Sequence, residues 1–270
     1  GDPVSRNGLP IGVFDSGVGG LTVLHECLVS LPAEDFLYLG DSGHFPYGTK
    51  SFDELRERAG AIATELLGRG VKMLVIACNS ATAAAGDEIR EMGARAGVPV
   101  VTVVGPEAEI AATISGNGRV GVLATPATVA SGAYRRALDE LGRPLTVTEV
   151  SAPDLAPIIQ EGPTFDEEVL DTVRGYCAPL REAEIDTLIL GCTHYPLVAP
   201  MLQRMLGRDV SLVTAGHAIA AAIQRELAER GELAETGPEG DYRFLVTGDV
   251  DSFAEVGTRF LQLPLTGRAE

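Results

Sequence analysis

The sequence predicts an α/β protein built from two doubly wound domains with mostly parallel sheets. Two observations lead to this prediction: short, continuously apolar runs alternate with longer amphipathic segments, and the second half of the chain repeats motifs of the first. Strands that are apolar throughout are usually covered by helices on both faces, which is typical of parallel sheets. Such sheets bind ligands beyond the carboxyl ends of their strands, so we expect the functional residues there.

The predicted strands are short runs rich in β-branched and other apolar residues. In chain order they lie at 11–14, 36–39, 73–77, 100–104, 120–124, 145–150, 187–190, 211–214 and 242–247. Amphipathic stretches between them predict helices, among them 51–69, 79–96, 127–141, 166–183 and 216–231. Strands that alternate with helices of this length indicate βαβ units, in which the strands are parallel.

The repeated motifs end predicted strands. KMLVIACNSAT (72–82) and DTLILGCTHYP (186–196) share a polar start, an apolar run, a small residue, a cysteine and then a hydroxyl or amide side chain. IGVFDSGVGG (11–20) has a similar counterpart in VGVLATPATVASG (120–132). We therefore expect two domains that are related by an approximate twofold, with the active site in the cleft between them.

The expected domains are not both continuous in sequence. A break is expected near 105–118, after the fourth strand, and the chain is expected to return to the first domain after about residue 210. The first domain would then comprise 1–104 together with 211–270, and the second domain 105–210.

Composition and charge limit the class of protein. Of the 270 residues, 45% are hydrophobic, which is ample for a packed core. The formal net charge is −17 without a Lys- and Arg-rich stripe, which argues against nucleic acid or an anionic membrane as the main partner. No apolar stretch reaches the roughly 18–20 residues of a membrane helix, and the first residues lack a signal-peptide pattern. We therefore expect a cytoplasmic protein.

The four cysteines divide into two kinds. Cys27 and Cys177 lie within helical patterns and are expected to be small buried side chains. Cys78 and Cys192 each follow a predicted strand, where a buried apolar thiol and a chemically active thiol are both possible. No C-x-x-C spacing links the four, which argues against a zinc site or a disulfide framework.

One glycine-rich loop follows the first predicted strand. FDSGVGG (14–20) places Asp15 and Ser16 at the strand end. Glycines let the backbone approach a ligand, and free N–H groups at the following helix attract an anion. A plain tight turn is the alternative interpretation.

A second loop, GDSGHFPYGTKS (40–51), follows the second predicted strand. Tyr47, with Gly48 beside it, is able to donate a hydrogen bond to a carboxylate. The alternative is a turn in which Ser51 caps the next helix.

Polar residues follow both strand-end cysteines. They are Asn79 and Ser80 after Cys78, and Thr193 and His194 after Cys192. Helix N-termini and polar donors favour the thiolate over the thiol. If the strand ends face each other across a cleft, one thiol can remove a proton from one face of a carbon while the other returns a proton to the opposite face.

These segments resemble the glutamate racemases of the aspartate/glutamate racemase superfamily. The resemblance covers almost the whole chain, through the segments IGVFDSGVGGL, PYGTKS, ACNSATA, ATPATVASGAY, LILGCTHYPL and VTGDVDSF. It implies a two-domain enzyme without cofactor or metal, commonly a homodimer, that interconverts L- and D-glutamate and supplies D-glutamate for peptidoglycan. Alternatives are an aspartate racemase or another isomerase of the superfamily, and a non-enzymatic regulatory protein on the same scaffold.

The resemblance also implies residue roles. Cys78 would take the proton from D-glutamate and Cys192 from L-glutamate, and Asp15 and His194 would assist the respective thiols. The implied substrate-binding residues are Asp15, Ser16, Tyr47, Gly48, Asn79, Ser80, Thr128, Thr193 and His194.

One segment departs from the family pattern. In APDLAPIIQEG (152–162), Gln160 stands where the family usually has a glutamate that assists the second cysteine, and Glu161 is its neighbour. Gln can form hydrogen bonds but cannot accept a proton. Either Glu161 takes the role, or Cys192 relies on His194 alone.

Overall fold

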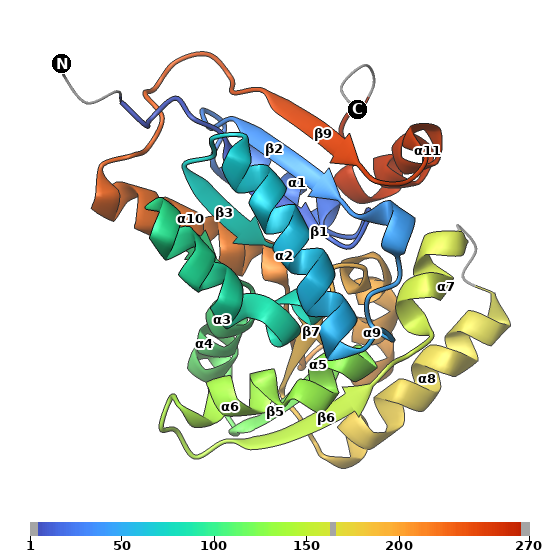
Figure 1. Ribbon diagram of the computed structural model, residues 1–270. Helices are drawn as coiled ribbons and strands as arrows, with labels where there is room; N and C mark the ends of the chain where they lie inside the picture. Colours follow the sequence, from blue (N-terminus) through green and yellow to red (C-terminus); the bar gives the residue numbers. More distant parts are fainter. Residues whose placement is uncertain (1–4, 163–165, 266–270) are drawn as a thin grey trace.

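The computed structural model describes residues 5–162 and 166–265, which form two sheets with helices packed around them (Figure 1). The strands are β1 (Ile11–Asp15), β2 (Phe36–Gly40), β3 (Met73–Ile76), β4 (Val100–Val101), β5 (Arg119–Ala124), β6 (Thr146–Ser151), β7 (Thr187–Gly191), β8 (Ser211–Val213) and β9 (Tyr242–Val246). Every strand pairing in this part of the chain is parallel. The predicted fold class is confirmed, and a strand forms at each predicted run.

The two sheets repeat one strand order. The five-stranded sheet has the order β4-β3-β1-β2-β9, and the four-stranded sheet has the order β6-β5-β7-β8. When β5 to β8 are matched in turn to β1 to β4, the second sheet reproduces the order β4-β3-β1-β2. The cysteine motifs therefore follow equivalent strands, β3 in the first sheet and β7 in the second.

Helices connect the strands and cover the sheets. They are α1 (Leu21–Ser30), α2 (Phe52–Gly68), α3 (Asn79–Ala96), α4 (Val104–Ile114), α5 (Pro126–Ser131), α6 (Ala133–Asp139), α7 (Leu155–Glu161), α8 (Glu167–Glu182), α9 (Ala199–Leu206), α10 (Ala215–Arg230) and α11 (Val250–Leu261), with short 3-10 helices η1 (Ser42–His44) and η2 (Tyr195–Val198). None of the helices in the described ranges is long and apolar enough to span a membrane.

The first sheet is covered on both faces, as a doubly wound sheet must be. Ile11 and Val13 of β1 pack in one apolar cluster with α1 and α10. Phe14 points to the opposite face and packs in a second cluster with α2 and α3 (Figure 1). Alternate residues of a strand face opposite sides of the sheet, so a strand covered in this way has to be apolar throughout.

One helical segment differs from the prediction, and another helix occupies the region of the expected domain break. The segment 127–141 forms two helices, because Gly132 has a φ of 68° and this left-handed backbone ends α5 before α6 begins. The segment 105–118, where a break between domains was expected, is mostly helical, since α4 occupies it to Ile114.

The sheet pairings also bear on the expected domain limits. β9 pairs with β2, so the first sheet takes strands from both ends of the chain. β8 pairs with β7, however, and a boundary between residues 210 and 211 would separate it from its own sheet. The second sheet therefore extends to Val213, and the division of the chain into domains otherwise stays a prediction.

Candidate active site

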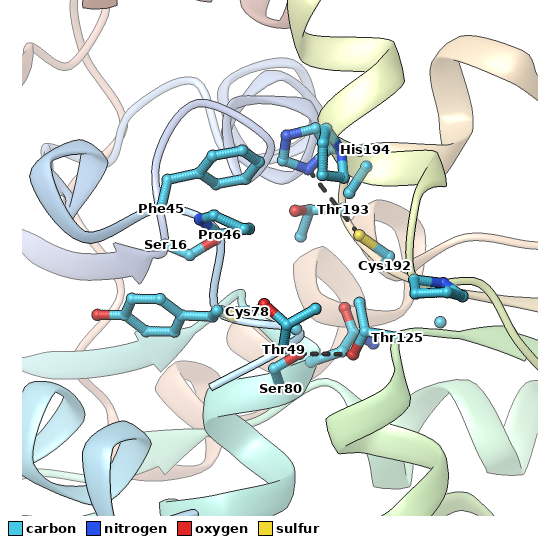
Figure 2. Close-up of a pocket in the computed structure, with 17 residues that line it drawn as sticks. Ser16, Phe45, Pro46, Thr49, Cys78, Ser80, Thr125, Cys192, Thr193 and His194 are labelled. Carbon is cyan, nitrogen blue, oxygen red and sulfur yellow. Dashed lines mark hydrogen bonds between the residues drawn. The ribbon is translucent and has the colours of Figure 1, made fainter. Parts of the chain in front are cut away.

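One pocket brings together the carboxyl ends of strands from both sheets. Its lining residues are Ser16, Phe45, Pro46, Tyr47, Gly48, Thr49, Cys78, Asn79, Ser80, Thr125, Pro153, Ala156, Pro157, Gly191, Cys192, Thr193 and His194. Figure 2 shows Cys78 with Ser16 on one side of this pocket and Cys192 with His194 on the other. Both cysteines singled out in the sequence therefore line the same pocket, whereas Cys27 and Cys177 are buried elsewhere.

Cys78 caps a long helix. It is the residue before α3, and its Sγ accepts a hydrogen bond from the backbone N–H of Ala81 at 3.5 Å. Burial, and then the nearby negative charge of Asp15, raise the pKa of the thiol to about 12, while the N–H of Ala81 and the hydroxyl of Ser16 oppose that rise. The helix start thus offsets part of the burial that disfavours the thiolate.

Asp15 lies behind the pocket lining, at the end of β1. It is fully buried, and its Oδ2 accepts the N–H of Gly17 at 3.0 Å while its Oδ1 accepts the hydroxyl of Thr193 at 3.4 Å. Burial raises the pKa of this carboxyl, and the N–H groups of Gly20, Gly17 and Ser16 work in the opposite direction. A buried carboxylate whose pKa is raised is a proton acceptor, here placed close to Cys78.

Cys192 has an imidazole as its neighbour. Its Sγ lies 3.9 Å from Nδ1 of His194, whose Nε2 lies 2.9 Å from Oε1 of Gln160. An amide oxygen only accepts, so this contact places the ring proton on Nε2 and leaves Nδ1 as the acceptor that faces the thiol. The backbone N–H of His194 also helps Cys192, but burial dominates and raises the pKa of the thiol.

His194 is held between aromatic rings. Phe45 stacks on it with the ring centres 5.3 Å apart, and Phe260 contacts it edge to face at 5.1 Å. Burial, and then the positive charge of Arg259, lower the pKa of His194 to about 3. The imidazole is therefore neutral at physiological pH, and its Nδ1 faces Cys192 as a hydrogen-bond acceptor.

The structure distinguishes the two residues proposed to support the second cysteine. Gln160 contacts His194 directly, and Arg259 holds the end of α7 by donating to the backbone oxygens of Ile159 and Gln160 at 2.5 and 3.5 Å. Glu161, the next residue, is exposed to solvent. In this arrangement the helix presents Gln160 to His194 and turns Glu161 away from it.

Tyr47, in the second predicted loop, contributes its ring to the pocket rather than a free hydroxyl. Tyr47 lines the pocket, but its hydroxyl donates a hydrogen bond to Asp41. Arg58 donates two hydrogen bonds to the same carboxylate, both at 3.0 Å, and Thr247 donates a third at 2.6 Å. Burial opposes the charge of Asp41, but these hydrogen bonds outweigh it and lower the pKa. The Tyr47 hydroxyl is therefore bonded to a carboxylate of the protein itself, that of Asp41.

Two glycines allow the halves of the site to touch. A Cβ on Gly19 would lie 2.3 Å from Nδ1 of His194, and a Cβ on Gly48 would lie 2.7 Å from Cβ of Thr125. The oxygen of Gly48 accepts the N–H of Ala127 at 3.0 Å across the same contact. Any side chain at either glycine would force the loops of the first sheet away from the strand ends of the second.

Two of the substrate-binding residues implied by the resemblance do not line the pocket. Asp15 lies behind Ser16, and Thr128 is fully buried against Thr125, whose hydroxyl contacts that of Thr128 at 3.2 Å. Thr125 does line the pocket and contacts the hydroxyl of Ser80 at 2.7 Å. It was missed, although its place directly after β5, at the start of a helix, matches that of the other strand-end residues.

A buried polar cluster behind the pocket was also missed. Asn79 donates from Nδ2 to Oε1 of Glu107 at 3.3 Å and to the hydroxyl of Tyr134, which itself donates to Oε1 of Glu107 at 2.6 Å. Glu107 was missed because its segment was expected to be a break between domains, and no local pattern distinguishes its buried glutamate from the exposed Glu109.

Among the described residues, no group of three or more His, Cys, Asp and Glu side chains is arranged to hold a metal ion. All four cysteines are free thiols. The pocket presents two thiols, each with its own polar neighbour.

Known proteins resemble this chain over nearly its full length. The Asp/Glu/Hydantoin racemase family profile matches residues 18–223. A glutamate racemase of Mycobacterium leprae is 44% identical over 260 residues, with 96% of this chain and 94% of that protein covered. A Francisella tularensis glutamate racemase, solved in complex with D-glutamate, superposes with a TM-score of 0.90 at 34% identity, covering 98% of this chain and 97% of that one.

A second solved structure holds the other enantiomer. The Escherichia coli glutamate racemase in complex with L-glutamate and an activator superposes with a TM-score of 0.75 at 30% identity, covering 93% of this chain and 95% of that one. Sequence profile, overall identity and fold agree, and the pocket lies where the strand-end motifs converge. The chain belongs to the Asp/Glu/hydantoin racemase family, and within that family to the glutamate racemases.

Proposed function

We propose that this protein interconverts L- and D-glutamate by a two-base mechanism in which Cys78 and Cys192 exchange protons with opposite faces of the α-carbon. The observation that supports this most directly is that two thiols follow equivalent strands, β3 and β7, and line one pocket from its two sides. Fixed groups on both faces allow inversion without movement of either base.

The proposed steps balance in protons and electrons. With D-glutamate bound, the Cys78 thiolate removes the α-proton, and the electron pair of the C–H bond stays on the α-carbon. The Cys192 thiol then delivers its proton to the opposite face. The products are L-glutamate, a Cys78 thiol and a Cys192 thiolate, and the reverse reaction begins from that state.

The substrate itself supplies charge that the thiols need. Burial raises the pKa of both thiols, so the pocket alone disfavours a thiolate. Glutamate brings an α-ammonium group next to the reacting carbon, and an opposite charge within a few ångströms lowers a thiol pKa. Binding would thus promote formation of the base, and the mechanism requires no cofactor.

Each thiol has a different proton acceptor. Asp15, whose pKa is raised, would take the proton from Cys78, and the neutral His194 would take it from Cys192 through Nδ1. In both cases the acceptor is buried, which keeps the proton exchange out of bulk solvent.

Glutamate is the substrate that the comparisons favour over aspartate. Relatives of this chain have been solved with D-glutamate and with L-glutamate, one with each. Hydroxyl and amide groups line the pocket and suit a substrate with two carboxylates and an ammonium; they are Ser16, Thr49, Asn79, Ser80, Thr125 and Thr193. Action in the cytoplasm, as a homodimer that supplies D-glutamate for peptidoglycan, belongs to the same proposal and rests on the family resemblance.

The test is a chiral assay of the purified protein without added cofactor. L-glutamate and D-glutamate should each converge on equal amounts of the two enantiomers, as followed by circular dichroism or chiral chromatography. L-aspartate should remain unchanged under the same conditions. Faster conversion of aspartate would support the alternative activity, and no conversion of either amino acid would refute the proposal.

A further inference from the structure

The buried cluster of Glu107, Tyr134 and Asn79 joins three helices directly behind the pocket. Glu107 belongs to α4, Tyr134 to α6 and Asn79 to the first turn of α3. Glu107 and Tyr134 are completely buried, and Asn79 is 2% exposed. Only Asn79 reaches the pocket lining, where it is the residue next to Cys78.

The hydrogen bonds of the cluster leave one atom of Asn79 unused. Its Nδ2 donates to both Glu107 and Tyr134, so both amide hydrogens have acceptors. Its Oδ1 is buried and has no hydrogen-bond partner within the described residues. A buried acceptor without a partner costs free energy, and here the amide that carries it belongs to the pocket lining.

Glu107 determines which way this amide is turned. The two ends of an Asn amide have nearly the same shape, and neighbouring donors and acceptors decide their orientation. Oε1 of Glu107 accepts from Tyr134 and from Asn79 at once, which directs the Tyr134 proton to Glu107 and leaves the phenol oxygen as a second acceptor for Nδ2. Rotation of the Asn79 amide would place Oδ1 against this pair of acceptors.

We propose that Glu107, acting through Tyr134, is a positioning residue that orients the Asn79 amide so that Oδ1 accepts a hydrogen bond from the α-ammonium group of the substrate. The inference rests on the proposed function and identifies how one substrate group is placed. At neutral pH glutamate has a single class of donor, its ammonium group, because both carboxylates only accept. An unpaired acceptor on a residue that lines the pocket is suited to the ammonium, beside the thiol that gains from a nearby positive charge.

The orientation does not depend on the ionisation of Glu107. Burial raises the pKa of its carboxyl to about 8, and the bonds from Tyr134 and Asn79 oppose that rise. Its Oε2 has no partner among the described residues, so a proton carried there leaves Oε1 free to accept from both neighbours. The amide is held in the same way by the acid and by the carboxylate.

The test compares Glu107→Met with Glu107→Gln. Methionine has a similar volume but no acceptor of comparable strength, so the hydroxyl of Tyr134 becomes free to donate to Oδ1 of Asn79 and to turn the amide. KM for glutamate should rise about tenfold or more, since a hydrogen bond to a charged group is worth about that factor in binding, and kcat should fall less. Glutamine keeps an acceptor for both neighbours, so KM should stay within about threefold of the parent value.

A double variant separates positioning from packing. In Glu107→Met combined with Tyr134→Phe, no hydroxyl is left to turn the amide, and KM should fall back toward the parent value relative to Glu107→Met alone. If the cluster only filled space, the second substitution would add to the damage. Tyr134→Phe alone, which retains the Glu107 acceptor, should raise KM by about threefold and keeps the inference testable if Glu107→Met fails to fold.

The matched control is Glu109→Met, which makes the same change at an exposed glutamate of the same helix and should leave KM unchanged. The dissociation constant of D-glutamate, measured by calorimetry, should follow KM through the whole series. The inference would be overturned if KM and binding were unchanged in Glu107→Met, or if KM were higher in the double variant than in Glu107→Met. The racemase assignment would stand in either case. A parent protein that binds glutamate without racemising it would instead refute the function, and the binding series would still decide the role of Glu107.

Discussion

The two sides of the pocket use equivalent strand positions but different local structures. Cys78 caps the 18-residue helix α3 and receives hydrogen bonds from the helix N-terminus, with the carboxyl of Asp15 nearby. Cys192 lies before the short 3-10 helix η2, and its polar neighbour is the neutral imidazole of His194. A duplicated strand order thus supports two unlike polar neighbours of the thiols, one that is anionic when deprotonated and one that is neutral.

This difference has a mechanistic consequence. A negative Asp15 opposes the Cys78 thiolate even as it offers a place for the proton, and the start of α3 compensates in part. On the other side, His194 carries no charge at physiological pH, so it does not oppose the Cys192 thiolate as Asp15 opposes that of Cys78. Substitutions on each side of the pocket test whether both sides are equally necessary for racemisation and how far the two neighbours of the thiols differ in their effect.

The largest effects are expected at the thiols themselves. Cys78→Ser and Cys192→Ser should each reduce racemisation by about 10³-fold or more, since a hydroxyl is far less acidic than a thiol. Each variant should still eliminate a leaving group from one enantiomer of a β-substituted analogue, because that reaction needs one base. Cys27→Ser and Cys177→Ser, made in buried helical thiols outside the pocket, should retain near-normal activity. Loss of activity in a folded Cys27→Ser protein would show that the wrong pair of thiols had been assigned.

Substitution of the proposed proton acceptors should lower kcat by an intermediate amount. The two substitutions should affect opposite directions of the reaction. Asp15→Asn and His194→Gln should each lower kcat by about tenfold to a hundredfold. In His194→Gln the deuterium isotope effect should grow for L-glutamate labelled at the α-carbon, and in Asp15→Asn it should grow for labelled D-glutamate. The ratio of kcat/KM in the two directions must remain one, because the enantiomers have equal free energy. Growth of the isotope effect in both directions in both variants would contradict separate acceptors.

The smallest effect concerns the departure from the family pattern. Gln160→Glu would place a carboxylate against Nε2 of His194 and raise the pKa of the imidazole, which makes it a stronger base. Turnover should increase by a few fold at most, and the acid limb of the pH–rate profile should move to higher pH, because a His194 with a raised pKa becomes protonated earlier as the pH falls.

Glu161→Gln is the matched control for that change. Glu161 is exposed, so this variant should leave turnover, the pH profile and the isotope effects unchanged. If Glu161→Gln slowed the reaction and Gln160→Glu did not alter it, the structural distinction between the two neighbours would be wrong.

The sequence by itself determined the class of the fold and the place of the chemistry. Continuously apolar runs of strand length have to be covered on both faces, and parallel strands bring their carboxyl ends to one edge of a sheet. Asp15, Cys78 and Cys192 could therefore be identified as strand-end residues from local patterns alone. The repeated cysteine motif also predicted two related halves, and the matching strand orders agree with that prediction.

Only the tertiary structure decided which neighbours support these residues. Gln160 rather than Glu161 contacts His194, because one residue along a helix changes the face on which a side chain lies. Thr125, the residue before α5, lines the pocket, whereas Thr128 in the first turn of that helix is buried behind it. Glu107 meets Asn79 across 28 positions of sequence. Contacts of this kind depend on how helices pack, and no local pattern of apolar and polar residues records that packing.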